Sequence, residues 1–440
     1  MSKESAAIDP SLLAAQEEAG PVKATFAERT ILRLLDALPL GCLHLHTPDG
    51  RHRVYGNEVP GTPPARIHIH RTRFFRRMLL DGEVGFGESY VDGDWDTEDL
   101  TRLLAYFLLN LEHFPGISGT RAKRLFYGML EKLNAIGHKL RRNTRRNSRR
   151  NIRAHYDLSN AFYQLWLDES WTYSSAFFES PEQALPEAQE AKFRRLAGKL
   201  DLRPDMHVLE IGCGWGGFAL HLAREHGVRV TGLTISREQL AKGRERVQEA
   251  GLADRVDLRF CDYRDMTGQF DAIVSVEMLE AVGHEFLGTF FGQCSHLLKP
   301  EGRLGLQVIL MPDKRYRTAR RETDWIKTHI FPGGQLPSLT AIQEALSRTG
   351  DFILHHAESF GLHYAKTLAL WHERFRACAA EVHALGFDEA FLRKWSFYLS
   401  YCEAAFAMRN ITVSQLVFAR PNNTRFHPPG EAALRDIIPW

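Results

Sequence analysis

The sequence of 440 residues is poor in cysteine, in long apolar runs and in net charge. Its six cysteines are scattered without a CxxC pair, which excludes a disulfide framework and zinc-like spacing and favours reduced thiols in a cytosolic protein. The N-terminus lacks a basic start followed by an apolar core, so we expect no signal peptide. The most apolar stretch, residues 100–111, contains Arg102 and is shorter than the roughly 20 residues of a membrane-spanning helix. Any membrane contact should be peripheral, at the inner surface.

The net charge of +2 conceals an uneven distribution of charge. Residues 121–153 hold 12 Lys and Arg against one acid, a local +11, and the other residues, with 44 basic and 53 acidic side chains, carry −9. On a helix this segment would present an arginine stripe that includes Arg141, Arg142, Arg145, Arg146, Arg149 and Arg150. An anionic membrane surface would favour such a stripe by about 1 kcal/mol per basic residue. The alternatives are a solvated linker, an RNA-binding arm and a docking site for a second subunit.

The pattern along the chain predicts two folded parts. Residues 1–24 should be frayed, and residues 25–115 read as a small α+β domain with a hairpin around Pro48-Asp49-Gly50. A helix or strand at residues 72–80 and a Gly- and Asp-rich stretch follow, before the apolar helix. After the basic linker or helix at 116–153, five short apolar strands alternate with helical stretches over residues 154–420. This alternation predicts an α/β fold with a doubly wound parallel sheet, followed by a polar tail at 421–440.

A glycine-rich turn follows the first of these strands. Gly212, Gly214 and Gly216 form a GxGxGG turn that leads into a helix, where backbone N–H groups approach a ligand closely. A dinucleotide site and a tight strand-to-helix crossing are the alternatives. Glu210 just before the turn offers a carboxylate to an ammonium group, and Asp262 after the third strand offers one to an adenine amino group. The second strand ends in GLTIS, without the acid of an NAD ribose contact.

These features resemble class I S-adenosylmethionine-dependent methyltransferases, with a Rossmann-like domain. Over residues 150–420 the resemblance becomes more specific, because several ordered motifs are similar to those of the cyclopropane-fatty-acyl-phospholipid synthase family: HYDLSNAFYQLWLDESWTYSSAFF, IGCGWGGFA, GLTISREQ, IVSVEMLEAVG, IFPGG and SFGLHYAKTLALWHERF. GESYVDGDWD resembles the N-terminal domain of longer members. The resemblance implies transfer of a methyl carbon to the double bond of an unsaturated phospholipid acyl chain. Ring closure then proceeds through a carbocation, with bound bicarbonate as the base.

The resemblance and the glycine turn together define the expected site. The predicted S-adenosylmethionine-binding residues are Tyr173, Ser174, Glu210, Gly212, Gly214, Gly216, Thr234, Ile235, Gln239, Asp262 and Tyr263. Glu280, Ile309 and Tyr364 match the family's bicarbonate-holding glutamate, its backbone ligand and its tyrosine hydroxyl. No metal is expected. The substrate class implied makes an anionic membrane the expected partner and a nucleic acid an unlikely one, and a homodimer stays open.

Two positions depart from the family pattern. Ser175 stands where many members have cysteine, and Gln307 stands where they have histidine. Both side chains can donate to an anion, but Gln307 cannot carry a charge, so ring closure is in more doubt than methyl transfer. A methyl- or methylene-branched product is the alternative outcome, and a non-catalytic lipid-binding protein is the alternative of another class. Glu277 lies three residues before Glu280, and both acids can share one side of a helical turn.

Overall fold

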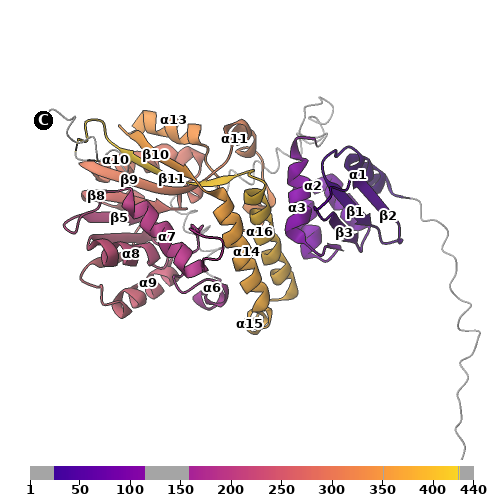
Figure 1. Ribbon diagram of the computed structural model, residues 1–440, viewed down its shortest axis with the longest axis horizontal. Helices are drawn as coiled ribbons and strands as arrows, with labels where there is room; N and C mark the ends of the chain where they lie inside the picture. Colours follow the sequence, from indigo (N-terminus) through magenta and orange to yellow (C-terminus); the bar gives the residue numbers. More distant parts are fainter. Residues whose placement is uncertain (1–23, 114–157, 350, 425, 427–440) are drawn as a thin grey trace, which may run out of the picture.

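The computed structural model describes residues 24–113, 158–349, 351–424 and 426. The expected frayed N-terminus, the basic segment with its arginine stripe and most of the tail lie outside these residues. Figure 1 shows the N-terminal part on one side of the molecule and the larger sheet on the other, with α14 and α16 between them. None of the helices in the described ranges combines the length and the apolarity needed to cross a bilayer.

The N-terminal part is a four-stranded sheet, in the order β2-β1-β3-β4, covered by helices on one face. The expected hairpin is confirmed as an antiparallel pair, and β3 then pairs parallel with β1. Alternation sends Leu43 and Leu45 into the core and their neighbours to the other face. The elements are α1 (Phe26–Asp36), β1 (Cys42–His46), β2 (His52–Gly56), β3 (Ala65–Ile69), α2 (Arg73–Val91), β4 (Trp95–Asp96) and α3 (Leu100–Leu109).

The Gly-rich stretch after residue 80, to which the sequence analysis assigned no secondary structure, is helical as far as Val91. Helix α2 runs through it with a kink at Gly82, whose φ of 54° no other residue adopts without strain. Gly87 is needed for close packing, because a Cβ there would lie 2.4 Å from the Trp325 ring of α12. The glycines of this stretch therefore have different roles: Gly82 permits the kink, Gly87 permits the contact with the C-terminal part, and Gly93 lies in the turn after the helix.

The C-terminal part confirms the doubly wound fold. All five predicted strands form, and they lie in a seven-stranded sheet of order β10-β11-β9-β8-β5-β6-β7. The strands β9, β8, β5, β6 and β7 run parallel, while β11 pairs antiparallel with β9 and β10. The strands are β5 (His207–Ile211), β6 (Arg229–Thr234), β7 (Val256–Phe260), β8 (Phe270–Val276), β9 (Leu298–Leu310), β10 (Ile353–Ser359) and β11 (Thr412–Ala419). The last two strands were not predicted.

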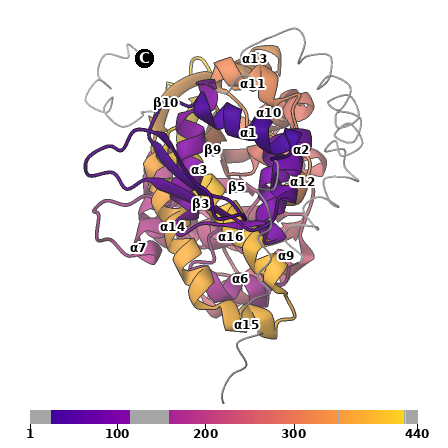
Figure 2. The same ribbon diagram turned by 90° about the vertical axis from the view of Figure 1, so that its right-hand side faces the viewer.

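Helices cover both faces of this sheet. One face packs against α7 (Leu185–Gly198), α8 (Gly217–His226) and α9 (Arg237–Glu249), and the other against α10 (Leu287–Leu297) and α13 (Leu339–Thr349). Figure 2, turned by 90°, shows the N-terminal part in front of α14 and α16, and α16 contacts α2 and α3. The remaining helices are α6 (Asn160–Trp166), α11 (Asp313–Ala319), α12 (Trp325–His329), α14 (Gly361–Ala377), α15 (Ala379–Ala384) and α16 (Glu389–Ala407).

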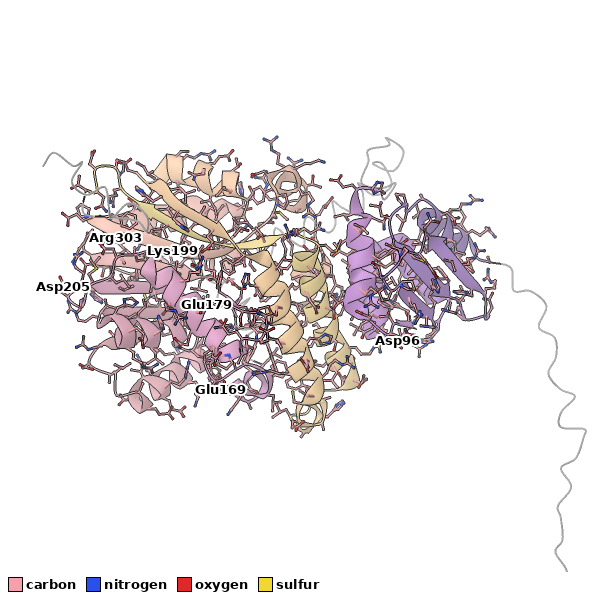
Figure 3. All side chains as sticks on the ribbon, viewed as in Figure 1. Asp96, Glu169, Glu179, Lys199, Asp205 and Arg303 are labelled. Carbon is pink, nitrogen blue, oxygen red and sulfur yellow. The ribbon has the colours of Figure 1, made fainter. Side chains whose placement is uncertain are left out.

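Helix α16 joins the two parts through buried aromatic packing and polar contacts. The Arg393 guanidinium donates to the Tyr90 carbonyl at 2.7 Å and pairs with Asp96 at 2.8 Å. Figure 3 labels Asp96 in the N-terminal sheet. The Tyr401 hydroxyl donates to Glu83 at 2.7 Å, and burial raises the pKa of that carboxyl. These contacts hold the N-terminal sheet against α16, a helix whose other residues line a large cavity of the C-terminal part.

Candidate active site

A cavity of about 1060 Å³ opens at the carboxyl ends of β5, β6, β7 and β8, the edge where doubly wound sheets bind ligands. It is lined by most of the predicted site residues: Tyr173, Ser174, Glu210, Gly212, Gly214, Thr234, Ile235, Gln239, Asp262, Tyr263, Glu280, Ile309 and Tyr364. Ser175, Gln307 and Gly216 lie outside its wall. Sequence segments more than 190 residues apart therefore meet around one space.

The glycine turn forms one end of the cavity. Gly212, Gly214 and Gly216 have φ values of 83°, 52° and 81°, so each adopts a conformation that favours glycine. At Gly212 a Cβ would also meet the Met278 side chain at 2.7 Å. Gly216 caps helix α8, whose first N–H groups face this end. The turn is thus shaped for close approach of a ligand to the backbone.

Several polar groups of the cofactor end are already ordered. The Thr234 hydroxyl donates to Gln239 at 2.8 Å, and both side chains are buried. Asp262 accepts from the Arg264 guanidinium at 2.6 and 2.8 Å, so its carboxylate oxygens face an arginine rather than standing free for an adenine amino group. Glu210 differs, because its Oε2 is shielded and has no hydrogen-bond partner among the described residues. Burial raises the pKa of Glu210 to about 8.

These residues fit S-adenosylmethionine. The glycine turn admits a ligand against the backbone, and the unpartnered Glu210 oxygen suits an ammonium group or a hydroxyl group. A positively charged ligand would also find carboxyl groups at the ends of two strands, Glu210 one residue before the end of β5 and the Glu277–Glu280 segment directly after β8. Tyr173 and Ser174 close the cavity from a loop that precedes α7.

The loop that carries Tyr173 and Ser174 is braced by residues that the motifs did not reveal. The buried Lys192 ammonium donates to the Ser174 hydroxyl at 2.8 Å, and burial lowers the pKa of Lys192. The Gln189 carboxamide donates to the Ser174 carbonyl at 3.0 Å. The Tyr173 hydroxyl shares a hydrogen bond of 2.7 Å with Tyr398 on α16. Both Lys192 and Gln189 lie on α7, where the sequence looks like an ordinary surface helix.

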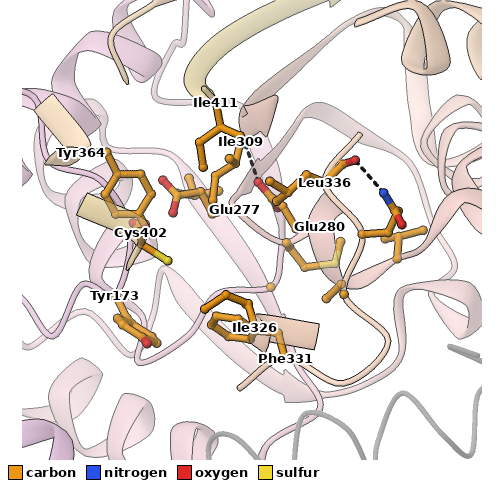
Figure 4. A pocket seen from close by; sticks show the side chains of 18 of the residues that line it. Tyr173, Glu277, Glu280, Ile309, Ile326, Phe331, Leu336, Tyr364, Cys402 and Ile411 are labelled. Carbon is orange, nitrogen blue, oxygen red and sulfur yellow. Dashed lines mark hydrogen bonds between the residues drawn. The ribbon is translucent and has the colours of Figure 1, made fainter. Parts of the chain in front are cut away.

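Glu277 is the main residue that the predicted site omitted. Its Oε1 accepts from the Ser175 amide at 2.9 Å and from the Gln307 carboxamide at 2.8 Å. Burial raises its pKa, and in Figure 4 its carboxylate points toward the Tyr364 ring. Glu277 also has a φ of 49°, a left-handed conformation that costs a non-glycine residue about 1–2 kcal/mol. Its position directly after β8 was the available sequence signal.

Ser175 and Gln307, the two residues that depart from the family pattern, were expected to donate to a bound anion, and the structure gives them other partners. The Ser175 hydroxyl donates to the Ala176 carbonyl at 3.0 Å, so only its amide N–H faces the Glu277 carboxylate. The Gln307 carboxamide does donate to a carboxylate, and its oxygen accepts from Gln415 at 3.1 Å. The Ser175 hydroxyl, predicted to donate to an external anion, therefore donates to the main chain, and the Gln307 carboxamide together with the Ser175 amide holds the Glu277 side chain.

Glu280 lies on the same wall and accepts a hydrogen bond from the Ile309 amide, as Figure 4 shows. Burial and the neighbouring Glu277 raise its pKa to about 8. Bicarbonate does not fit this arrangement. The donors at residues 175 and 307 are already engaged, and a bound anion beside Glu277 would bring two like charges together in a buried space. We therefore derive no step through bicarbonate.

The chain was compared with known proteins. The model of the family described as mycolic acid cyclopropane synthetase matches residues 143–416. The tuberculostearic acid methyltransferase UfaA1 of Mycobacterium tuberculosis is 36% identical, over 90% of this chain and 91% of that protein. The cyclopropane-fatty-acyl-phospholipid synthase of Escherichia coli is 37% identical, over 83% of this chain and 90% of that one.

Solved structures agree with these relatives. The mycolic acid cyclopropane synthase CmaA1 complexed with SAH and CTAB superposes with a TM-score of 0.58 at 33% identity. The comparison covers 61% of this chain and 97% of that one. The cyclopropane synthase MmaA2 of Mycobacterium tuberculosis gives the same TM-score over 62% of this chain.

Proposed function

The chain belongs to the mycolic acid cyclopropane synthetase family of S-adenosylmethionine-dependent methyltransferases, which modify unsaturated lipids, and from this premise we propose that it methylates a double bond in an acyl chain of a membrane phospholipid. One observation carries the proposal: the glycine turn and the carboxyl groups Glu277 and Glu280 open on one cavity. Its other walls are largely apolar, with Phe331, Leu368, Phe406 and Ile411 among them, and they suit an aliphatic chain.

Bound S-adenosylmethionine supplies an electrophilic methyl group, which an alkene takes up to leave a positive charge on the acyl chain. The protein's residues act on that charge. The carboxyl groups at the ends of β5 and β8 have raised pKa values because they are buried, and a positive charge beside them would favour their ionised form, which in turn stabilises the cation. The aromatic rings of Tyr364 and Phe406, whose centroids lie 4.4 Å apart, line the same space and offer their π faces to a cation. Exclusion of water matters because water would convert the cation to an alcohol.

Glu277 is the base in this proposal. Once a carbocation has formed, a proton must leave the transferred methyl carbon, and a Glu277 carboxylate oxygen is the acceptor. Two donors fix Oε1, the Tyr364 hydroxyl also interacts with the carboxylate, and we assign the proton to Oε2. The raised pKa of the buried carboxyl suits an acceptor that must hold a proton near neutral pH. The strained backbone of Glu277 supports this role, because strain of this kind concentrates at functional positions.

The fate of the C–H bonding electrons decides the product. If they close onto the neighbouring cationic carbon, the product is a cyclopropane ring, and the Escherichia coli relative supports this outcome. If a hydride shifts first, the same electrons form an exocyclic double bond and leave a methylene branch. The presence of Glu277 among the donors expected to hold an external anion favours the branched product as a second candidate. The similarity to a tuberculostearic acid methyltransferase supports it independently.

The mouth of the cavity is the proposed entry for the lipid. Leu108 and Leu111 of the N-terminal part and Lys314 and Arg315 around α11 line it. Lys314 is exposed and pairs with the equally exposed Glu112 at 3.3 Å; in the proposal a lipid phosphate takes the place of that carboxylate, while the leucines suit the acyl chain. The arginine stripe beyond the described residues remains a predicted second contact with an anionic inner membrane surface.

Transfer of labelled methyl groups into phospholipid vesicles with monounsaturated chains tests the proposal. We expect label in the lipid fraction, and vesicles with saturated chains are the matched control. Hydrogenation followed by mass spectrometry separates the products, because a methylene branch takes up hydrogen readily and a ring resists mild conditions. Cofactor binding without label in any unsaturated lipid would overturn the proposed substrate.

A further inference from the structure

The outer face of the N-terminal sheet carries a concentration of imidazoles that the methyl transfer does not use. Alternation along β1 places Cys42, His44 and His46 on one face, opposite the buried Leu43 and Leu45. The β2 and β3 residues paired with His46 are also histidines, His52 and His68. The His46 ring stacks on both, with centroids 4.4 and 4.6 Å away.

At one end of this face three different ligand types converge. The Cys42 Sγ, a ring nitrogen of His44 and a carboxylate oxygen of Glu58 all lie within 4.8 Å of one another. His44 Nε2 is shielded from solvent and makes no hydrogen bond among the described residues, although Glu58 Oε1 lies 3.4 Å away. That separation matches two ligands of one tetrahedral zinc ion, which stand about 3.3–3.8 Å apart for bond lengths of about 2.0–2.3 Å.

We propose that Cys42, His44 and Glu58 bind a first-row transition metal ion of the Zn²⁺ type. Thiolate, imidazole and carboxylate are all zinc ligands, and three protein ligands leave a fourth position for water or for the adjacent His52. Cys42 is held by the sheet, and Glu58 lies in the segment after β2 with its side chain 70% exposed. Glu58 can therefore move the roughly 1 Å needed to close the site without disturbing the core.

The charges around the trio are compatible with a cation. Arg66 pairs with His44 in the register of β1 and β3, but its guanidinium donates to Glu98 at 2.6 Å, which offsets its charge. The Glu58 carboxylate raises the pKa of the Cys42 thiol together with burial. A bound metal ion would reverse that effect and stabilise the thiolate. The trio shares no residue with the cavity wall, so the metal is not part of the methyl transfer.

Titration of the full-length protein with Co²⁺ tests the site. We expect one Co²⁺ per chain, a near-ultraviolet thiolate-to-cobalt absorption band and displacement of Co²⁺ by Zn²⁺. Glu58→Gln and His44→Asn should weaken binding at least tenfold, and Cys42→Ser should abolish the band. Glu112→Gln and His70→Asn change the same residue types on the same part of the molecule, away from the trio and from Arg66, and should leave affinity unchanged.

Three outcomes would overturn the proposal: no thiolate band in the unmodified protein, unaltered affinity in Glu58→Gln, or an equal loss in the two control variants. The last outcome would assign the binding to exposed histidines in general. Since Glu58 is exposed, a folding defect does not obscure the Glu58→Gln result, and circular dichroism checks Cys42→Ser.

Discussion

Replacement of Glu277 separates its role as a base from its role in packing. Glu277→Gln keeps an oxygen that can accept from the Ser175 amide and from Gln307, at the 2.9 and 2.8 Å observed for the carboxylate. It removes the negative charge, and with it the ability to take a proton, and it places an amide nitrogen where a carboxylate oxygen faces the Tyr364 hydroxyl. General bases contribute about 10²–10⁴-fold to a rate, which is about 3–5 kcal/mol of barrier at 1.36 kcal/mol per decade. We expect turnover to fall by this factor while cofactor affinity is retained.

Glu277→Gly is the informative companion variant. With φ at 49°, glycine relieves about 1–2 kcal/mol of backbone strain. It also leaves the Ser175 amide and the Gln307 carboxamide without their shared acceptor, at a cost of about 1–3 kcal/mol for each buried donor. Those two donors then become available to an external anion. Added bicarbonate should therefore restore part of the turnover of Glu277→Gly and none of the turnover of Glu277→Gln.

The assay is single-turnover transfer of labelled methyl groups to unsaturated phospholipid vesicles, in buffer depleted of carbon dioxide and then supplemented with bicarbonate. Binding of S-adenosylhomocysteine by calorimetry controls for cofactor affinity. Wild-type turnover in Glu277→Gln would refute the assignment of Glu277 as the base. Equal rescue of both variants by bicarbonate would refute the account of the two donors.

Three further predictions concern pH, packing and the membrane. Burial raises the pKa of Glu280 to about 8 from its ordinary value of 4.5. The stability that the protonated carboxyl contributes is therefore complete below pH 4.5 and is lost as the pH rises through 8. In urea denaturation Glu280→Gln should be more stable than the wild type at about pH 8.5, and this difference should shrink toward about pH 5. Gly87→Ala would place a Cβ 2.4 Å from the Trp325 ring and should lower the free energy of unfolding by about 1–3 kcal/mol in the same assay. Gly198→Ala, with no atom within 4 Å of the added Cβ, should change it by less than about 1 kcal/mol. Equal effects of the two substitutions would contradict the packing account. Replacing four arginines of the basic segment by glutamine should weaken the sedimentation of the protein with anionic vesicles, most strongly at low salt. The four are Arg145, Arg146, Arg149 and Arg150. Unchanged binding would indicate that the segment is only a linker.

The sequence by itself determined the catalytic fold and the cofactor end of the site. Five apolar strands alternating with helices allow few arrangements other than a doubly wound sheet. A glycine turn after the first strand then indicates the ligand-binding edge of the sheet, because glycines allow the tight turn and the close approach of a ligand that this edge needs. Glu210 could be assigned to the cavity for the same reason, because it lies directly before the glycine turn, whereas Tyr173 was assigned from the resemblance of its motif to the family.

The tertiary structure decided which polar groups face one another. Ser175, Glu277 and Gln307 are separated by 102 and 30 residues, and nothing local to any of them specifies that they share hydrogen bonds. The reason for glycine at position 87 was also hidden, because it is the Trp325 ring of a helix distant in the sequence. A short motif predicts the backbone conformation of its own segment. Whether a carboxylate meets two donors or an incoming anion depends on contacts that form only when the whole sheet has assembled.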